Sequence, residues 1–466
     1  MNRLKNKILK ITCKFKAAHG GITRYERTTL LFTKRLGYIG YLISILLLPF
    51  YLILRFVKSI FSKLQLFYET HTAPFLSVKL GWIFWPIYRL LAFQNICFIV
   101  NIGDVTGHVI LELDYFFRKL NSDQNLKNKR YVWLGKSKHT TRAMVKTYKH
   151  KFWFALSNTF VYDLLFPIII RYKDITLDCG LSQLKWQLTD DLKYHKRKYG
   201  HNCLYLLSEN EYKRQYIEQL KLRLRSKNYF PLLDYVKVNN NSKLIEFLNG
   251  RTERLAMIHI KTEIVNATAK ITDPQTYLPA MKYLLDNEYQ IVFVGREKMP
   301  QEFLAFNIIN YANSDIATFE HDIQIFKLAE LAITAGSGIA WFPDCFNKPY
   351  LFLNSWALPF MLPSPKCISV PTLVQKPSGE FLKFSEQINL CNYSADPKYI
   401  PTGYKFRNAT GDEILMAMQE LIELKDKSVE RSQLQEKFRN ISDDAPYFWA
   451  LSRVSNYFLQ KHIELF

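Results

Sequence analysis

The sequence lacks the paired or clustered cysteines that a disulfide framework or a zinc site requires. Its seven cysteines are odd in number and widely scattered, and neither a Cys-x-x-Cys motif nor a Cys/His cluster occurs. Small disulfide scaffolds and tetrahedral zinc sites both depend on such groupings. The pattern therefore excludes both classes and favours a reducing, cytosolic environment, in which the Asn-x-Thr match at Asn266 is accidental.

Acidic residues are scarce relative to basic ones. There are 41 Asp and Glu against 63 Lys and Arg, which gives a formal net charge of +22. Such a surplus indicates an anionic partner: membrane lipid, nucleic acid or a phosphorylated substrate. With 466 residues, 48% of them hydrophobic, the chain is long enough and apolar enough for two to three domains with their own cores.

A hydrophobic segment lies near the N-terminus, after a basic stretch. Leu36 to Leu54 carries no formal charge, and about 20 residues suffice to cross a bilayer core. A buried core helix is the alternative, but the charge-free length exceeds that of an ordinary one. A cleaved signal peptide is not expected, because the basic region is too long and no small-residue cleavage site follows. Basic residues on both sides leave a crossing, a re-entrant and an interfacial arrangement open.

Two later regions alternate between apolar strands and amphipathic helices. The first has a strand over 96–102 and a helix over 108–120, and the second has strands over 255–260, 289–294 and 308–311. This alternation predicts an α/β fold with parallel sheets covered by helices on both faces. Thr410 and Glu413 predict a capping box for a helix near 413–424. The predicted divisions are a membrane-associating region 1–92, a first α/β domain 93–245, a second α/β domain 246–427, and a helical tail 428–466 that packs back on the body.

The second region ends in a glycine-rich loop between a strand and a helix. A buried strand ends at Thr334, Ala335-Gly336-Ser337-Gly338 forms a tight loop, and a helix starts at Ile339. The first backbone N–H groups of a helix lack internal partners, and the helix dipole favours negative charge. The loop therefore predicts a phosphate site, with an ordinary strand-to-helix turn as the alternative.

Three blocks carry a family resemblance. They are Thr106-Gly107-His108; His259-Ile260-Lys261; and Gly295-Arg296 with Asn310-Tyr311-Ala312, Asp322, Ser337-Gly338 and Phe346-Asn347-Lys348-Pro349. The blocks resemble an uncharacterised family of bacterial proteins regarded as glycosyltransferases, with a fold like the GT-B and fucosyltransferase-like enzymes. Together they span roughly residues 95 to 360, and their order and spacing are more specific than any one block. The family usually has Arg where Lys261 stands, which puts a bidentate phosphate contact in doubt.

The resemblance implies two Rossmann-like domains facing a cleft, with a nucleotide-sugar donor held mainly by the second. Ser337 and Gly338 would hold the diphosphate, while Lys261 and Arg296, just past strand ends, would neutralise it. Neither a cofactor nor a metal ion is expected, because GT-B-type enzymes often stabilise the leaving diphosphate with cationic side chains. The sequence also has no Asp-x-Asp pair. The predicted donor-binding residues are His259, Lys261, Gly295, Arg296, Asp322, Gly336, Ser337 and Gly338.

Sugar transfer also needs a base to deprotonate the acceptor hydroxyl. His108 is the first candidate, with a helix N-cap or a loop hydrogen bond as the alternative, and Glu263 is the weaker candidate. His259 lies within an apolar strand, so a core histidine is the simpler interpretation of it. For Asp322 we expect a cap on a helix that starts at Ile323, with a ribose or base contact as the alternative.

The expected function is transfer of a sugar to a glycan or lipid-linked acceptor at the cytoplasmic face of the bacterial inner membrane, beside anionic lipid. A sugar-nucleotide epimerase that hydrolyses UDP-GlcNAc is an alternative on the same scaffold, although an anchored enzyme is unexpected for soluble substrates. A basic module that binds nucleic acid is the other alternative. Because much of the positive charge lies near the hydrophobic segment, lipid explains it better, and no nucleic-acid partner is expected.

Overall fold

The chain divides into two compact units, Met1–Thr72 and Ala73–Phe466, and every sheet described below lies in the second. The predicted membrane segment Leu36–Leu54 lies outside the described residues. Among the residues that are described, no helix is long and apolar enough to cross a membrane. The computed structural model describes residues 60, 64, 85–100, 106–135, 152–158, 161, 176–178, 184–186, 204–206, 209–226, 229–235, 242–250, 253–262, 271–355, 364–390, 401–426, 430–441 and 450–466.

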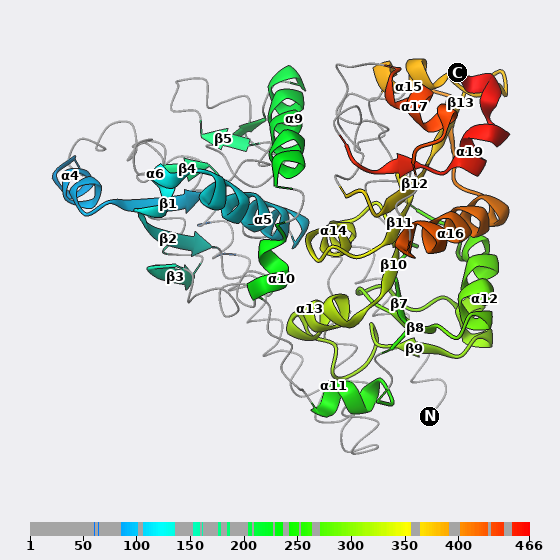
Figure 1. Cartoon of the computed structure of the whole chain (residues 1–466), viewed down its shortest axis with the longest axis horizontal. Coiled ribbons are helices and arrows are strands. Elements are labelled where there is room, and N and C mark those ends of the chain that lie inside the picture. The colour runs from blue at the N-terminus through cyan, green and yellow to red at the C-terminus, as the bar shows by residue number, and fades with distance from the viewer. Residues whose placement is uncertain are drawn as a thin grey trace. The chain divides into compact units, whose positions relative to one another are not determined.

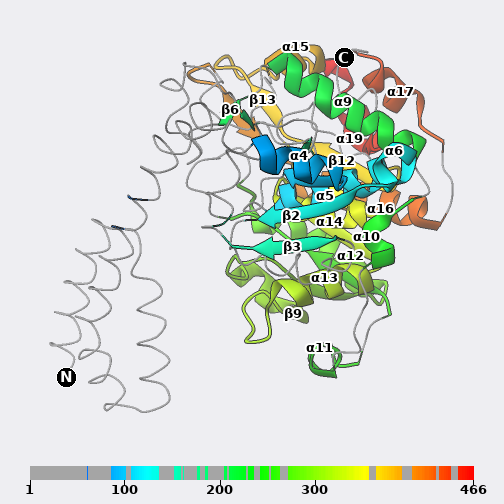
Figure 2. The ribbon, with the colours of Figure 1, turned by 90° about the vertical axis from the view of Figure 1, so that its left-hand side faces the viewer.

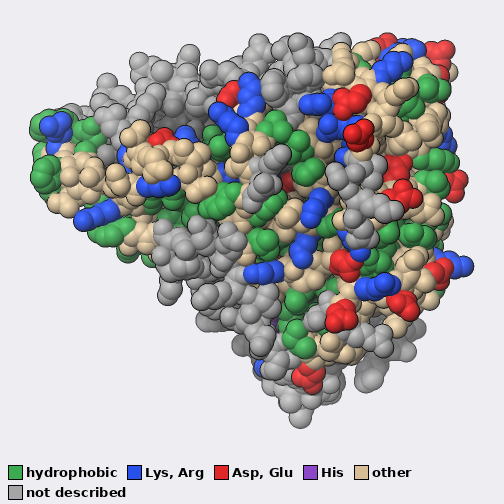
Figure 3. All heavy atoms as spheres, viewed as in Figure 1, with side chains coloured by type: hydrophobic (Ala, Val, Ile, Leu, Met, Phe, Trp, Pro, Cys, Tyr) green, Lys and Arg blue, Asp and Glu red, His purple; other side chains and the backbone are tan. Residues whose placement is uncertain are grey.

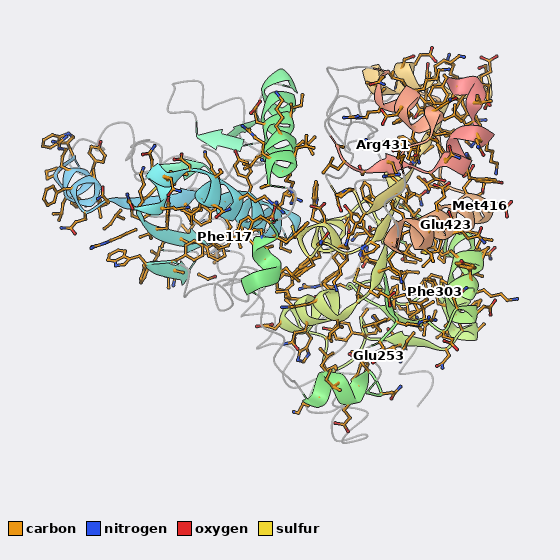
Figure 4. The ribbon with its side chains drawn as sticks, viewed as in Figure 1. Phe117, Glu253, Phe303, Met416, Glu423 and Arg431 are labelled. Atoms are coloured by element: carbon orange, nitrogen blue, oxygen red, sulfur yellow. The ribbon has the colours of Figure 1, made fainter. Side chains whose placement is uncertain are left out.

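The first sheet is parallel and has the strand order β3-β2-β1-β4. Its strands are β1 (Ile96–Val100), β2 (Arg130–Gly135), β3 (Phe154–Ser157) and β4 (Thr176–Asp178). Helix α4 (Trp85–Phe93) precedes β1, while α5 (Thr106–Ser122) and α6 (Gln124–Lys127) connect β1 to β2. The centre of β2 is an unbroken buried run, as expected for a parallel strand covered on both faces. Phe117 of α5 belongs to the core above it (Figure 4).

The second sheet is also parallel, with the order β15-β12-β11-β10-β7-β8-β9. Counted from β7, the order is that of a doubly wound dinucleotide-binding sheet, extended by one strand. The prediction of an α/β fold with parallel sheets is therefore confirmed. The GT-B arrangement, two such domains facing a cleft, stays a prediction. The strands are β7 (Leu255–Ile258), β8 (Gln290–Phe293), β9 (Ile308–Asn310), β10 (Leu331–Ala335), β11 (Tyr350–Ser355), β12 (Cys367–Pro371) and β15 (Arg453–Val454).

Alternation along the strands of the second sheet builds a core on each face. Leu255 and Met257 of β7 belong to one apolar cluster, whereas Ala256 and Ile258 belong to the other. Helices α13 (Phe319–Leu328) and α14 (Trp341–Cys345) cover one face, and α12 (Leu278–Asp286) and α16 (Gly411–Asp426) cover the other (Figure 1).

Apart from the 17-residue α9, the remaining described elements are short. They are the 3₁₀ helices η6 (Pro274–Tyr277), η7 (Gln301–Ala305), η8 (Gly338–Ala340) and η10 (Ile463–Leu465); helices α9 (Glu209–Arg225), α10 (Pro231–Tyr235), α11 (Ser242–Phe247), α15 (Phe384–Leu390), α17 (Gln433–Arg439) and α19 (Asn456–Lys461); and the antiparallel pairs β5 (Leu184–Trp186) with β6 (Leu204–Leu206) and β13 (Leu373–Gln375) with β14 (Lys405–Arg407).

The predicted capping box is present. The backbone N–H of Thr410 donates to Glu413 Oε2 at 2.9 Å, and the backbone N–H of Glu413 donates to Thr410 Oγ1 at 3.4 Å. Beyond residue 428 the chain contributes β15 to the sheet edge as well as helices, and Phe458 lies in the core. The predicted domain boundaries stay predictions.

A buried cluster of four charges connects α5, α9 and α14. Arg118 Nε contacts Asp114 Oδ2 at 2.8 Å, and Arg223 Nη2 contacts the same oxygen at 2.7 Å. Arg223 Nη1 also forms an ion pair with Asp344. The two positive and two negative charges balance, as buried charges require. The cluster therefore holds α14, which follows the glycine loop, against α5.

Candidate functional site

A pocket of about 260 Å³ lies at the carboxyl ends of β7, β8 and β10. Strands β7 and β10 are neighbours in the sheet although β8 and β9 separate them in the chain. Connections after β7 and after β10 therefore leave towards opposite faces, which opens a crevice at this point of an open parallel sheet. The topology alone thus indicates a candidate ligand site where the predicted residues gather.

All the predicted donor-binding residues except Gly336 line this pocket, although they come from separate parts of the chain. His259 and Lys261 follow β7, Gly295 and Arg296 follow β8, Asp322 lies on α13, and Ser337 and Gly338 follow β10. Gly336 lies in the same loop, directly before Ser337. The site therefore combines three strand ends with the first turn of one helix.

Gly295 allows the ring of His259 to approach the β8 end. Its φ is +113°, a conformation that side-chain-bearing residues rarely adopt. A Cβ atom there would lie 2.7 Å from His259 Cδ2 and 3.0 Å from Glu297 Oε2. Glycine is therefore required at this position by both the backbone and the packing.

Glu297 lies at the centre of the polar groups in the pocket, and the sequence did not indicate it. Its Oε1 pairs with Lys261, its Oε2 accepts from the backbone N–H of Arg296 at 3.2 Å, and His259 Nε2 lies 3.6 Å from Oε2. Burial alone would raise the pKa of Glu297, but the hydrogen bonds from His259 and Lys261 and the charge of Lys261 outweigh it and hold that pKa well below its usual range. The carboxylate thus occupies a position that attracts anions.

His259 is both buried and part of the pocket wall. Burial lowers its pKa, so the ring is neutral at pH 7. With Nε2–H directed at Glu297, Nδ1 is left as an acceptor, and Ser337 Oγ lies 3.4 Å from it. Ser337 Oγ also accepts from the backbone N–H of Ile339 at 3.2 Å. Its proton is therefore directed at His259, and Ser337 orders the loop rather than offering a ready donor to a phosphate.

The helix predicted after the loop is present, but its first turn is a 3₁₀ helix, so its α-helical part is short. It consists of η8 and the five-residue α14, which begins at Trp341. A helix of this length has few aligned peptide dipoles. The positive potential of the pocket therefore comes mainly from Lys261 and Arg296.

The expectation that Asp322 caps a helix is wrong. Helix α13 begins at Phe319, and its N-cap is Thr318, whose Oγ1 accepts from the backbone N–H of His321 at 3.2 Å. Asp322 instead lies in the first turn, half-buried in the pocket wall, with a hydrogen bond to the Tyr311 hydroxyl. Burial raises its pKa to about 7, against the opposing influence of that bond and of the Arg296 charge. Asp322 therefore titrates near neutral pH.

Aromatic side chains close the apolar side of the pocket. Phe326 and Phe342 are stacked with ring centroids 4.2 Å apart, and Phe319 meets Phe342 edge-on at 5.7 Å. The pocket thus has a cationic part beside an apolar wall that carries one acidic group.

The two base candidates are not placed by this geometry. His108 lies in the first turn of α5, but its side chain is outside the described residues, as is Glu263 altogether. Helix α5 packs against η8 and α14, the elements that follow Ser337. Their role as bases stays a prediction.

Within the described parts of the chain, no group of three or more His, Cys, Asp or Glu side chains could hold a metal ion. The expectation of a metal-independent reaction stays a prediction.

A comparison with protein-family models finds no match, and neither does a comparison with curated proteins. Among solved structures, the chain is similar to the E. coli ADP-heptose LPS heptosyltransferase II, with 13% identity, 71% of this chain and 100% of that chain covered, and a TM-score of 0.42. It is also similar to a glycosyl transferase family 9 protein from Veillonella parvula, with 11% identity, 71% and 96% covered, and a TM-score of 0.38. An E. coli heptosyltransferase with ADP-2-deoxy-2-fluoro heptose gives 12% identity, 61% and 94% covered, and a TM-score of 0.32. Likeness at this level assigns neither fold nor function to this chain.

Proposed function

We propose that this chain is a glycosyltransferase that binds the diphosphate of a nucleotide-sugar donor in the pocket beyond β7, β8 and β10. The observation that carries the proposal is the meeting of Lys261, Arg296 and the Gly336–Gly338 loop at the point where the strand order of the sheet reverses. Two cationic side chains beside a tight glycine loop suit a diphosphate. The adjoining apolar wall suits a nucleoside.

Donor binding, in this proposal, exchanges one anion for another. The diphosphate takes the place of the Glu297 carboxylate beside Lys261, and Arg296 contacts it from the β8 loop. As the glycosidic bond to the donor breaks, negative charge grows on the leaving diphosphate, and these two cations stabilise it. The Asp322 carboxyl group on the apolar side is available to a ribose hydroxyl.

The acceptor half of the reaction is assigned to the first sheet and its α5. A base there, His108 or more weakly Glu263, takes the proton from the acceptor hydroxyl while that oxygen attacks the anomeric carbon. We propose a glycan or lipid-linked acceptor in surface polysaccharide synthesis, at the cytoplasmic face of the inner membrane. The basic, hydrophobic composition of residues 1–92 supports this location.

Acceptor-dependent turnover tests the proposal. Release of nucleoside diphosphate from GDP-, UDP-, ADP- and dTDP-sugars, and of CMP from CMP-sugars, is measured with and without membrane glycolipid extracts. We expect release from one donor that needs an acceptor and falls at least tenfold in Arg296→Ala, but not in Lys282→Ala, an exposed cation on α12. Release without any acceptor would favour the epimerase or hydrolase alternative. Unchanged turnover in both Arg296→Ala and Lys261→Ala would refute the site.

A further inference from the structure

The N-terminal edge of the first sheet presents exposed aromatic side chains. Helix α4 has no buried residue, and Phe93 at its end is 82% exposed. At the start of β3, Trp153 is 58% and Phe154 is 47% exposed. We call these residues the aromatic edge: Trp85, Ile87, Leu90 and Phe93 of α4, with Trp153 and Phe154.

The two parts of the aromatic edge lie at the starts of β1 and β3, with the start of β2 between them. The backbone N–H of Arg130, at the start of β2, donates to the carbonyl of Asn95 at 2.8 Å, and that of Trp153 donates to the carbonyl of Tyr131 at 2.9 Å. Neighbouring strands lie about 4.8 Å apart, so residues at successive strand starts adjoin. Figure 1 shows α4 beside the start of β1, and Figure 2 shows β2 and β3 side by side.

The charged side chains in the segments around this edge are basic, apart from Asp123, the N-cap of α6. The segments 85–100, 124–135 and 152–158 contain no Asp or Glu, but they contain Arg89, Lys127, Lys129 and Arg130. The guanidinium of Arg89 lies 5.6 Å from the ring centre of Trp85. Hydrophobic side chains and Lys or Arg side chains gather together at this end of the molecule in Figure 3.

We propose that the aromatic edge docks on the surface of an anionic lipid bilayer. Aromatic rings with a polar or cationic neighbour concentrate at the headgroup level of membranes, and basic groups there gain from anionic lipid. The chain position agrees, because α4 is the first described helix of its unit after the charge-free segment Leu36–Leu54. This surface belongs to the folded body and is independent of the donor pocket.

Lipid contact can be measured residue by residue in the full chain. The protein is bound to phosphatidylcholine–phosphatidylglycerol vesicles with and without brominated lipid. The loss of tryptophan fluorescence that the brominated lipid causes is recorded as the quenched amplitude. We expect Trp85→Phe and Trp153→Phe each to lower the quenched amplitude, and Trp341→Phe, in the donor-site helix, to leave it unchanged. The double variant Phe93→Ser/Phe154→Ser should also lower the quenched amplitude. The control Leu304→Ser/Ile463→Ser alters two exposed apolar residues of the second sheet's domain and should leave the quenched amplitude unchanged.

An unchanged quenched amplitude in both Trp85→Phe and Trp153→Phe would overturn the proposal even if the vesicles retain the protein through another segment. The alternative occupant is a second copy of the chain. In that case Phe93→Ser/Phe154→Ser would convert a dimer to a monomer in sedimentation without changing lipid quenching, which would also overturn it. Loss of quenching in vesicles of phosphatidylcholine alone would confirm the role of the basic residues.

Discussion

Gly295→Ala introduces a single methyl group at the junction between β8 and the pocket. The backbone there has φ +113°, which costs an alanine about 1–3 kcal/mol. The added Cβ also lies 2.7 Å from His259 Cδ2, and the histidine ring is buried, so it cannot move into solvent. Overpacking of this kind costs about 1–3 kcal/mol more. We therefore expect a total loss of about 4 kcal/mol in the free energy of unfolding of the second sheet's domain.

Gly379→Ala provides a matched control. Gly379 has φ +92°, but no atom lies within 4 Å of the position that a Cβ would take there, so only the backbone cost applies. Urea denaturation, followed by tryptophan fluorescence, gives the unfolding midpoint of each variant. The slopes of the free energy of unfolding against urea concentration should be comparable, so the midpoints report stability. Gly295→Ala should be less stable than Gly379→Ala by about 1–3 kcal/mol, the cost of the contact with His259. Equal losses in the two variants would refute the close approach of His259 and with it the described shape of the pocket.

Three further predictions concern charge. Glu297→Gln removes the anion beside Lys261, so calorimetry should show about tenfold tighter binding of inorganic diphosphate; weaker binding would mean that Glu297 only positions Lys261. Because burial raises the pKa of Asp322 from 3.8 to about 7, its folded form keeps a proton that the unfolded form loses. Its contribution to the free energy of unfolding is therefore full below pH 3.8 and is lost as the pH rises through 7. Between pH 4 and pH 8, the free energy of unfolding of Asp322→Asn should therefore rise by about 2–4 kcal/mol relative to that of the parent. Parallel pH profiles of the two proteins would contradict this. Asp344→Asn should lower the free energy of unfolding by about 3–5 kcal/mol, because it leaves the buried Arg223 charge without one of its partners. The double variant Asp344→Asn/Arg223→Met should recover part of that loss. If the losses of the two single variants simply add in the double variant, the buried pair is refuted.

The sequence predicts strands β1, β7, β8, β9 and β10 because they are short apolar runs, but it indicates neither β3 nor β12. Leu331–Ala335 and Tyr350–Ser355 stand out by composition, and the loop between them carries its own glycines. The parallel order of the sheet then brings the ends of β7, β8 and β10 together, so residues that follow those strands meet. This is why Lys261, Arg296 and Ser337 could be predicted as one site.

The missed features depend on contacts that no local pattern contains. Glu297 follows a predicted strand end, but its importance comes from Lys261 and His259, which are more than thirty positions away in the chain. The sequence prediction starts α13 at Ile323, although Thr318 offers a suitable N-cap, because Phe319 does not stand out locally as part of an apolar helical face. The two-residue β15 is too short for a strand pattern and forms because β12 is beside it.

The central claim is that the pocket binds a nucleotide-sugar diphosphate, and thermal unfolding of the full chain with a panel of GDP-, UDP-, ADP-, CMP- and dTDP-sugars tests it most directly. A ligand that binds only the folded form adds about 2.7 kcal/mol of stability at a hundredfold excess over its dissociation constant. We predict a rise in melting temperature for one nucleotide class that is lost in Arg296→Ala and kept in Lys282→Ala. The claim would be contradicted if no member of the panel raised the melting temperature. It would also be contradicted if Arg296→Ala and Lys261→Ala both kept the rise.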